Sequence, residues 1–94
     1  MRVHGKKVLE DFKQRHADVR SHVDAWICEV EEAEWQSPHD IKGQYATAKL
    51  LGENRVVFNL KGNSYRLDAK VSYPTQVVLV VRIGTHAEYD KWTF

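Results

Sequence analysis

The sequence has few of the features that mark several large classes of protein. It contains one cysteine in 94 residues, which excludes an internal disulfide and a zinc site built from several cysteines. Its longest uninterrupted apolar run extends only from Val77 to Val81, far short of a membrane span. The first residues, Met1 to Gly5, form no apolar signal region. We therefore expect a single cytoplasmic domain, residues 1–94, without a membrane partner.

Neither sign of charge dominates the chain, which has a formal net charge of +1. The charges are nevertheless unevenly distributed, because residues 1–47 hold seven Lys/Arg and nine Asp/Glu, whereas residues 48–94 hold seven and four. The hydrophobic fraction of 43% is that of an ordinary folded domain. A basic second half permits contact with nucleic acid but does not require it.

Apolar residues recur at helical spacing in the first half of the chain. Residues 6–16 are predicted to form a short amphipathic helix. Ser37 and Pro38 predict the start of another short helix that ends near Tyr45. Between them, Asp18 is the predicted N-cap of the clearest helix. The apolar stripe of that helix consists of Val19, Val23, Trp26, Ile27 and Val30.

The second half of the chain changes to a period of two, which is typical of strands. Short connections between its segments predict an antiparallel meander. Residues 50–51 and 2–3 are weaker strand candidates. The predicted fold is therefore α+β, with N-terminal helices packed on one face of a small, mainly antiparallel sheet and a short helix at the C-terminal end. The main predicted strands are residues 55–60, 65–73 and 76–83.

The second face of this sheet is predicted to be open and basic. In the last strand we expect Leu79 and Val81 to join the core, which leaves Val78, Val80 and Arg82 on the open face. Arginine beside flat apolar surface favours single-stranded nucleic acid, although an ordinary solvated face would have the same composition. The other residues expected there are Val57, Arg55, Asn59, Arg66 and Lys70, with Asp68 as the only acid.

The C-terminal segment adds candidate catalytic groups beside Arg82. Gly84 is expected to end the last strand, and the spacing of Thr85 and Glu88 predicts a capping box that starts a final short helix. His86 then lies in the first turn of this helix. A lone histidine there is more often a plain surface residue, and the nearby Arg82, Tyr89 and helix N-terminus strengthen the alternative of a functional role without displacing that interpretation. The remaining histidines have no metal-ligand spacing, and no metal or cofactor is expected.

Two runs of residues together resemble the HigB family of bacterial type II toxin–antitoxin systems, within the wider RelE/ParE-type superfamily. The first is Phe-Asn-x-Lys-Gly-Asn-x-Tyr-Arg at residues 58–66, and the second is Gly-Thr-His-Ala-Glu-Tyr-Asp at residues 84–90. The upstream segment around Trp26 and residues 35–42 is also similar. The resemblance covers nearly the whole chain except residues 92–94, and it implies helices on a curved antiparallel sheet.

The resemblance also implies a function, namely an mRNA endoribonuclease that acts on the translating ribosome. The partner would be a HigA-like antitoxin with a helix-turn-helix. Arg66 and Arg82 would stabilise the phosphate during metal-free attack by the RNA 2′-OH. His86 would act as general acid or base, and Tyr89 would stack on a base or assist proton transfer. The expected RNA-binding residues are Arg55, Asn59, Lys61, Lys70 and Lys91.

Two alternatives stay open on the sequence alone. The same superfamily contains ParE-like toxins that inhibit DNA gyrase rather than cut RNA. A non-catalytic RNA-binding module would carry the same basic face without cleaving its ligand. Unlike a ribonuclease, both alternatives would leave mRNA intact.

Overall fold

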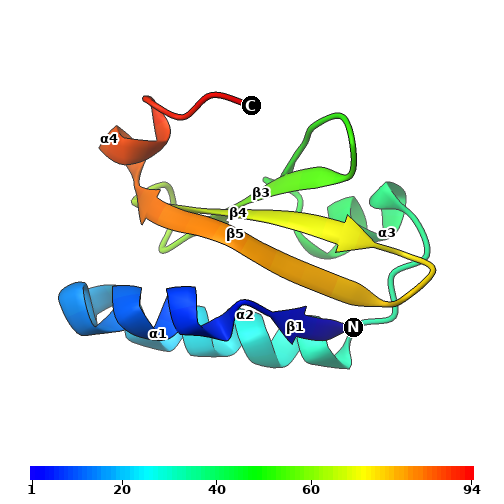
Figure 1. The fold of residues 1–94 in the computed structure, drawn as a ribbon, viewed down its shortest axis with the longest axis horizontal. Helices are drawn as coiled ribbons and strands as arrows, with labels where there is room; N and C mark the ends of the chain where they lie inside the picture. Colours follow the sequence, from blue (N-terminus) through cyan, green and yellow to red (C-terminus); the bar gives the residue numbers. More distant parts are fainter.

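The computed structural model describes residues 1–94 and has α1 and α2 on one side of a five-stranded sheet (Figure 1). The strand order is β1-β5-β4-β3-β2, in which β1 is parallel to β5 and the other pairs are antiparallel. The predicted α+β class is confirmed. The elements are β1 (Arg2–His4), α1 (Lys6–Arg15), a 3₁₀ turn (Ala17–Val19), α2 (Arg20–Glu32), α3 (Pro38–Gln44), β2 (Lys49–Leu50), β3 (Arg55–Leu60), β4 (Tyr65–Ser72), β5 (Val77–Thr85) and α4 (His86–Tyr89).

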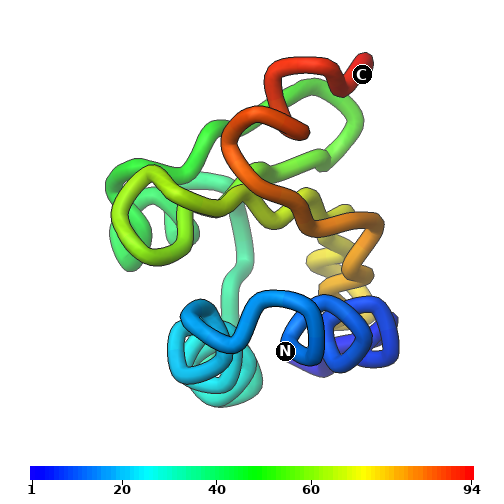
Figure 2. The backbone as a smooth tube through the Cα atoms, turned by 90° about the vertical axis from the view of Figure 1, so that its left-hand side faces the viewer, coloured from blue at the N-terminus to red at the C-terminus, as the bar shows by residue number.

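The core lies between the sheet and the pair of helices, which run side by side beneath it (Figure 2). The predicted stripe is confirmed at Val23, Trp26 and Val30, all of which are buried. Trp26 packs edge-on against Phe58 of β3, with ring centroids 5.3 Å apart. Each such fully buried large side chain stabilises the fold by about 1.5–3 kcal/mol. No helix has the length and apolar composition needed to span a bilayer.

The start of α2 differs from the prediction. Asp18 does not cap this helix, because α2 begins at Arg20 after the 3₁₀ turn and has no side-chain cap. Its carboxylate instead accepts hydrogen bonds from Lys61 Nζ at 2.9 Å and from the Tyr65 hydroxyl at 2.8 Å. These two bonds attach the turn between β3 and β4 to the helical layer. They also lower the pKa of Asp18, the bond from Lys61 most strongly.

The prediction of which β5 side chains face the core is wrong. Val78 and Val80 are buried, whereas Leu79 and Val81 are 45% and 40% exposed. Both sets of alternating residues in this strand are apolar, so the sequence pattern carries no information about which set faces the helices. Leu79 and Val81 therefore form an apolar ridge on the side of the sheet that faces away from α1 and α2. We call this side of the sheet the outer face.

A β-bulge explains why Arg82 nevertheless lies on the outer face. Asp68 pairs with Arg82, but the next residue of β4, Ala69, pairs with Val80. Val81 is therefore an extra residue on β5, and both it and Arg82 are directed outward. The expected position of Arg82 is correct, but it results from an irregularity that alternation does not predict.

The chain crosses back over the outer face after α4. We call residues 90–94 the tail, and it ends beside the loop between β2 and β3 (Figures 1 and 2). The prediction that Gly84 ends the last strand is wrong, because Gly84 lies inside β5. A Cβ atom at this position would lie 3.0 Å from Cζ2 of Trp92 and 3.1 Å from Cβ of Glu88. The missing side chain therefore makes room for α4 and the tail to pack on the sheet.

Candidate nucleic-acid interface

The strand register brings five predicted site residues to the outer face. Residues that pair directly across antiparallel strands lie on the same face of the sheet. Lys70 is exposed, whereas the three arginines and Asn59 are only partly exposed. The amide of Asn59 donates to the Thr47 carbonyl at 3.3 Å. The directly paired residues are Arg55 with Lys70, Asn59 with Arg66, and Asp68 with Arg82.

Asp68 is the electrostatic centre of this face. It is the one buried charged residue of the chain, with 0% exposure. Its carboxylate accepts from Arg55 Nε at 3.1 Å, from Arg55 Nη2, and from Arg82 Nε at 2.9 Å. One carboxylate thus orients two guanidinium groups, and the three charges together leave a net charge of +1. The expectation of a fully open face is wrong here, because Asp68 and its neighbour Val57 are covered.

The tail supplies part of this cover by stacking on the arginines. The Arg82 guanidinium carbon lies 4.4 Å from the Trp92 ring centroid and 5.0 Å from that of Phe94. The Phe94 ring also lies 5.5 Å from the Arg55 guanidinium carbon. In addition, Arg82 Nη2 donates to the Thr93 carbonyl at 3.0 Å. The sequence gives no signal for this cover, because apolar side chains in a terminal segment indicate no particular partner.

The same pattern continues to Arg66 and Tyr89. The Arg66 guanidinium carbon lies 5.2 Å from the Tyr89 ring centroid, and Tyr89 meets Trp92 edge-on at 5.6 Å. Aromatic rings and guanidinium groups therefore form one continuous series of contacts across the outer face, in the order Arg55, Phe94, Arg82, Trp92, Tyr89 and Arg66. Cation–π contacts of this kind contribute about 0.5–1 kcal/mol each at exposed sites. We call this set the arginine–aromatic ladder, which consists of Arg55, Arg66, Arg82, Tyr89, Trp92 and Phe94.

His86 lies at the Arg66 end of the ladder, and α4 fixes its backbone. The predicted capping box is present, because the Glu88 N–H donates to Thr85 Oγ1 at 3.2 Å and the Thr85 N–H donates to the Glu88 carboxylate at 2.9 Å. The Thr85 N–H also holds the pKa of Glu88 below its usual value. The imidazole is 54% exposed, stacks near Tyr89 at 6.4 Å, and has Nδ1 3.7 Å from Asp90. The imidazole is therefore accessible from solvent at this end of the ladder.

The predicted lysines are not all brought together. Lys61 lies in the turn between β3 and β4, where its ammonium group is bonded to Asp18 on the helical layer. Lys91 is exposed in the tail. Lys49, which the sequence analysis does not single out, is exposed on β2 and pairs with Val57 of the outer face. A strand of two residues has too little alternation to reveal this placement.

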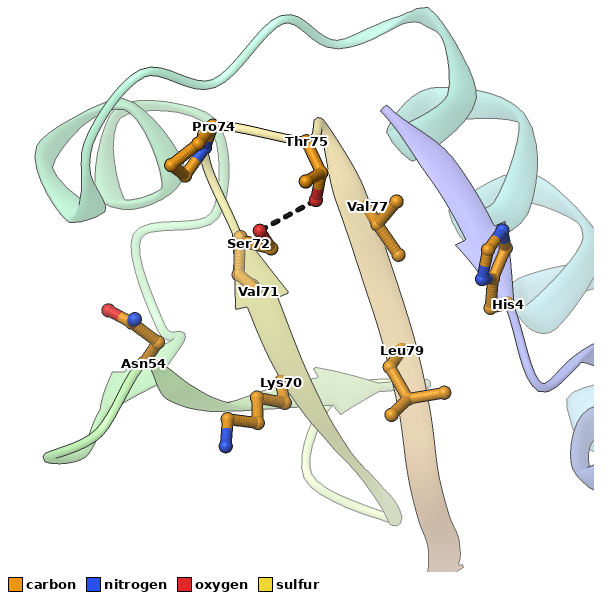
Figure 3. A pocket seen from close by; sticks show the side chains of 9 residues that line it. All are labelled: His4, Asn54, Lys70, Val71, Ser72, Pro74, Thr75, Val77 and Leu79. Carbon is orange, nitrogen blue, oxygen red and sulfur yellow. Dashed lines mark hydrogen bonds between the residues drawn. The ribbon is translucent and has the colours of Figure 1, made fainter.

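A groove of about 640 Å³ adjoins the Lys70 end of the outer face (Figure 3). Val77 and Leu79 give it an apolar wall, and Lys70 adds one cationic group. The Thr75 hydroxyl donates to Ser72 across one side, at 2.6 Å. The groove and His86 lie at opposite ends of β5, a separation of roughly 25 Å at 3.3 Å per residue. A ligand that touched both would have to be extended along the strand.

The side chains that could bind a metal ion do not cluster in this structure. No group of three or more His, Cys, Asp or Glu side chains is placed to hold a metal ion. What the outer face does offer is guanidinium groups, which suit phosphate oxygens, and flat rings, which suit nucleobases. One exposed imidazole completes the set of groups that acid–base chemistry on a nucleic acid would use.

Comparison with protein families identifies one match. The model of the HigB toxin family, described as the RelE-like toxic component of a toxin–antitoxin system, matches residues 19–92. A comparison with curated proteins finds no match. The matched region begins just before α2 and includes every candidate site residue, whereas Thr93 and Phe94 lie outside it.

Proposed function

Because this chain belongs to the HigB family of RelE-like toxins of toxin–antitoxin systems, we propose that it is an mRNA endoribonuclease that acts on the translating ribosome in the bacterial cytoplasm. The observation that carries the proposal is the outer face, where His86 lies next to Tyr89 and Arg66 at one end of the arginine–aromatic ladder. Arginine and aromatic side chains are the groups that bind single-stranded RNA without a base-pairing partner.

The proposed reaction uses the RNA itself as the nucleophile. The 2′-oxygen attacks the adjacent phosphorus, so a P–O2′ bond forms while the P–O5′ bond breaks. The products are a 2′,3′-cyclic phosphate and a free 5′-hydroxyl. One proton leaves the 2′-oxygen and one is delivered to the 5′-oxygen, so that a general base and a general acid balance the reaction. The proposal needs no metal ion or cofactor.

Arg66 is better placed than Arg82 to bind the reacting phosphate. Arg66 uses Nη1 for the carbonyls of Asn63 at 2.8 Å and Tyr65 at 3.4 Å, which leaves Nε and Nη2 for phosphate oxygens. Arg82 uses Nε for Asp68 and Nη2 for the Thr93 carbonyl. It would contribute its remaining nitrogen and its positive charge to the crowded transition state.

His86 would transfer one of the two protons, because imidazole is the side chain most often used as a general acid or base. Tyr89 would position His86 by stacking, hold a base, or assist the second transfer. Lys91 and Lys70 would bind flanking phosphates, together with Arg55 and Asn59. Lys61 would have to leave Asp18 before it could do the same.

Membership of the family implies an antitoxin partner. We propose that this partner is HigA-like and carries a helix-turn-helix DNA-binding motif. A partner that silenced the toxin would have to keep mRNA away from the outer face, either by covering it or by preventing entry to the ribosome.

Primer extension tests the proposed function. An mRNA incubated with translating ribosomes and this protein should be cut, with the new 5′ ends mapped by primer extension, and the same mRNA without ribosomes should stay intact. End-group analysis of the upstream fragments should find 2′,3′-cyclic phosphates. Cleavage should persist in chelator under conditions that keep ribosomes assembled. Intact mRNA combined with blocked DNA supercoiling would identify a gyrase inhibitor instead. Bound but uncut mRNA would identify a binding module.

A further inference from the structure

The tail places its own aromatic rings where the proposed substrate would lie. The guanidinium group of Arg82 contacts both the Trp92 ring and the Phe94 ring. A guanidinium plane stacks equally on a nucleobase, because bases and aromatic side chains both present a flat π-face. In the protein without RNA, the rings of Trp92 and Phe94 therefore occupy the stacking surface of Arg82.

The two rings are held with different strength. Trp92 is partly buried, lies against Gly84 and meets Tyr89 edge-on. Phe94 is 60% exposed, and it contacts the guanidinium groups of Arg82 and Arg55 and, at a ring-centroid distance of 6.5 Å, the tilted ring of Tyr89. Trp92 is thus part of the packed structure, whereas little holds Phe94 in place.

Phe94 also has room to move. It borders a groove of about 370 Å³, which Arg55 and the β2–β3 loop residues 51–53 complete. This volume is within the range of about 300–1,000 Å³ that small-molecule sites occupy. A planar ring that left Arg82 could therefore be accommodated beside its present position without repacking the sheet.

The arginine, by contrast, stays in place when Phe94 leaves. Asp68 is fully buried and accepts from Arg82 Nε at 2.9 Å. This bond is made on the sheet side and does not involve the tail. An incoming flat ring would meet a guanidinium group that is already oriented, so little conformational entropy is lost on stacking.

We infer that a nucleobase of single-stranded RNA stacks on Arg82 in the place that Phe94 fills in the free protein. Trp92 is the fixed ring of this base site and Phe94 is its intramolecular competitor. The inference rests on the proposed function for the class of ligand, which is RNA. The stacking exchange itself follows from the contacts of Arg82.

Opposite effects of two ring deletions test the inference. Binding of a fluorescein-labelled, uncleavable 2′-O-methyl oligoribonucleotide is measured by anisotropy for the wild type and for each variant. Phe94→Ala should tighten binding about two- to fivefold, the fold-change that corresponds to one lost competing contact of about 0.5–1 kcal/mol. Trp92→Ala should weaken binding about two- to fivefold, because it removes the ring that lies 4.4 Å from the Arg82 guanidinium carbon and helps to orient that group, a contact of about 0.5–1 kcal/mol.

Conservative variants and an optical signal serve as controls. Phe94→Tyr keeps a competing ring and should bind like the wild type, and Trp92→Phe keeps a stacking ring if Trp92→Ala fails to fold. Trp26 and Trp35 are only 1% and 2% exposed. A change in tryptophan emission on RNA binding should therefore come from Trp92 and vanish in Trp92→Phe.

Three results would overturn the inference. These are weaker or equal binding by Phe94→Ala, binding unaffected by both substitutions of Trp92, and no binding by any variant. None of them decides whether mRNA is cut on the ribosome, which primer extension measures separately. Conversely, tight binding with the expected signs and no cleavage would uphold the base site and reject the ribonuclease.

Discussion

Replacement of Asp68 by asparagine would remove the charge that holds two arginines on the outer face. The substitution keeps the size of the side chain and one carbonyl oxygen. It leaves Arg55 and Arg82 next to a neutral group whose NH₂ cannot accept from either of them. Because Asp68 has no exposure, water cannot reach the side of the two arginines that faces Asp68, and it cannot replace the hydrogen bonds lost there.

The expected magnitude follows from the burial of the three side chains. Removal of one partner from a fully buried ion pair costs about 3–5 kcal/mol. The side chains of Arg55 and Arg82 keep 26% and 32% exposure, so water recovers part of the loss. We expect the free energy of unfolding to fall by about 2–3 kcal/mol. At about 4–8 °C per kcal/mol for a domain of this size, the midpoint should fall by roughly 10–20 °C.

Urea and thermal unfolding followed by circular dichroism measure this loss, with Asp18→Asn as the matched control. Asp18 accepts a similar number of hydrogen bonds, but its side chain is 50% exposed, so its replacement should cost far less. A midpoint for Asp68→Asn equal to that of Asp18→Asn would refute the argument. It would mean that the arginines are solvated well enough to need no counter-charge.

Three further predictions concern the neighbouring groups. His86→Gln should lower single-turnover cleavage on the ribosome by roughly 10²–10⁴-fold with ribosome binding retained, and unchanged cleavage would move the proton transfer to another residue. Arg66→Ala should abolish cleavage and growth arrest while thermal unfolding is nearly unchanged, because its guanidinium bonds only to carbonyl oxygens at the surface; full toxicity would exclude it from the site. The Thr85 N–H lowers the pKa of Glu88, so this carboxylate should stabilise α4 at neutral pH and lose that effect as the pH falls through its lowered pKa. A carbon-detected NMR titration that places the Glu88 pKa at or above that of a free glutamate would contradict this reasoning.

The sequence predicts the elements better than the contacts between them. Helical spacing correctly predicts the buried stripe of α2, and the turn residues at 61–63 and the capping box correctly predict two element boundaries. The side-chain directions of β5 are not predictable in this way, since residues 77–81 are all apolar and the bulge at Val81 has no sequence signature. Register across the sheet, which decides these directions, depends on pairing with residues distant in sequence.

The candidate site illustrates the same limit. Alternation places Asp68 on the outer face correctly, but it does not predict that Trp92 and Phe94 stack on the two arginines bonded to Asp68, because these rings lie in a segment without periodicity. The bond between Lys61 and Asp18 joins residues far apart in the chain, and nothing in either local pattern predicts it. The position of a side chain is therefore predictable when it depends on a single helix or strand, and it is not predictable when it depends on contacts between two of them.

The position of β5 within the sheet has a consequence for how the protein is made. It follows the other four strands in the chain, yet it lies between β1 and β4, so β1 has no partner and β4 has only β3 until β5 has left the ribosome. Pairings between such distant segments form slowly because a long loop must close first. His86 and Tyr89 follow β5 directly, so the nascent chain cannot assemble its outer face while residues after β4 are still inside the exit tunnel. A chain interrupted before β5 would leave β1 and one edge of β4 unpaired, a form prone to aggregation and proteolysis.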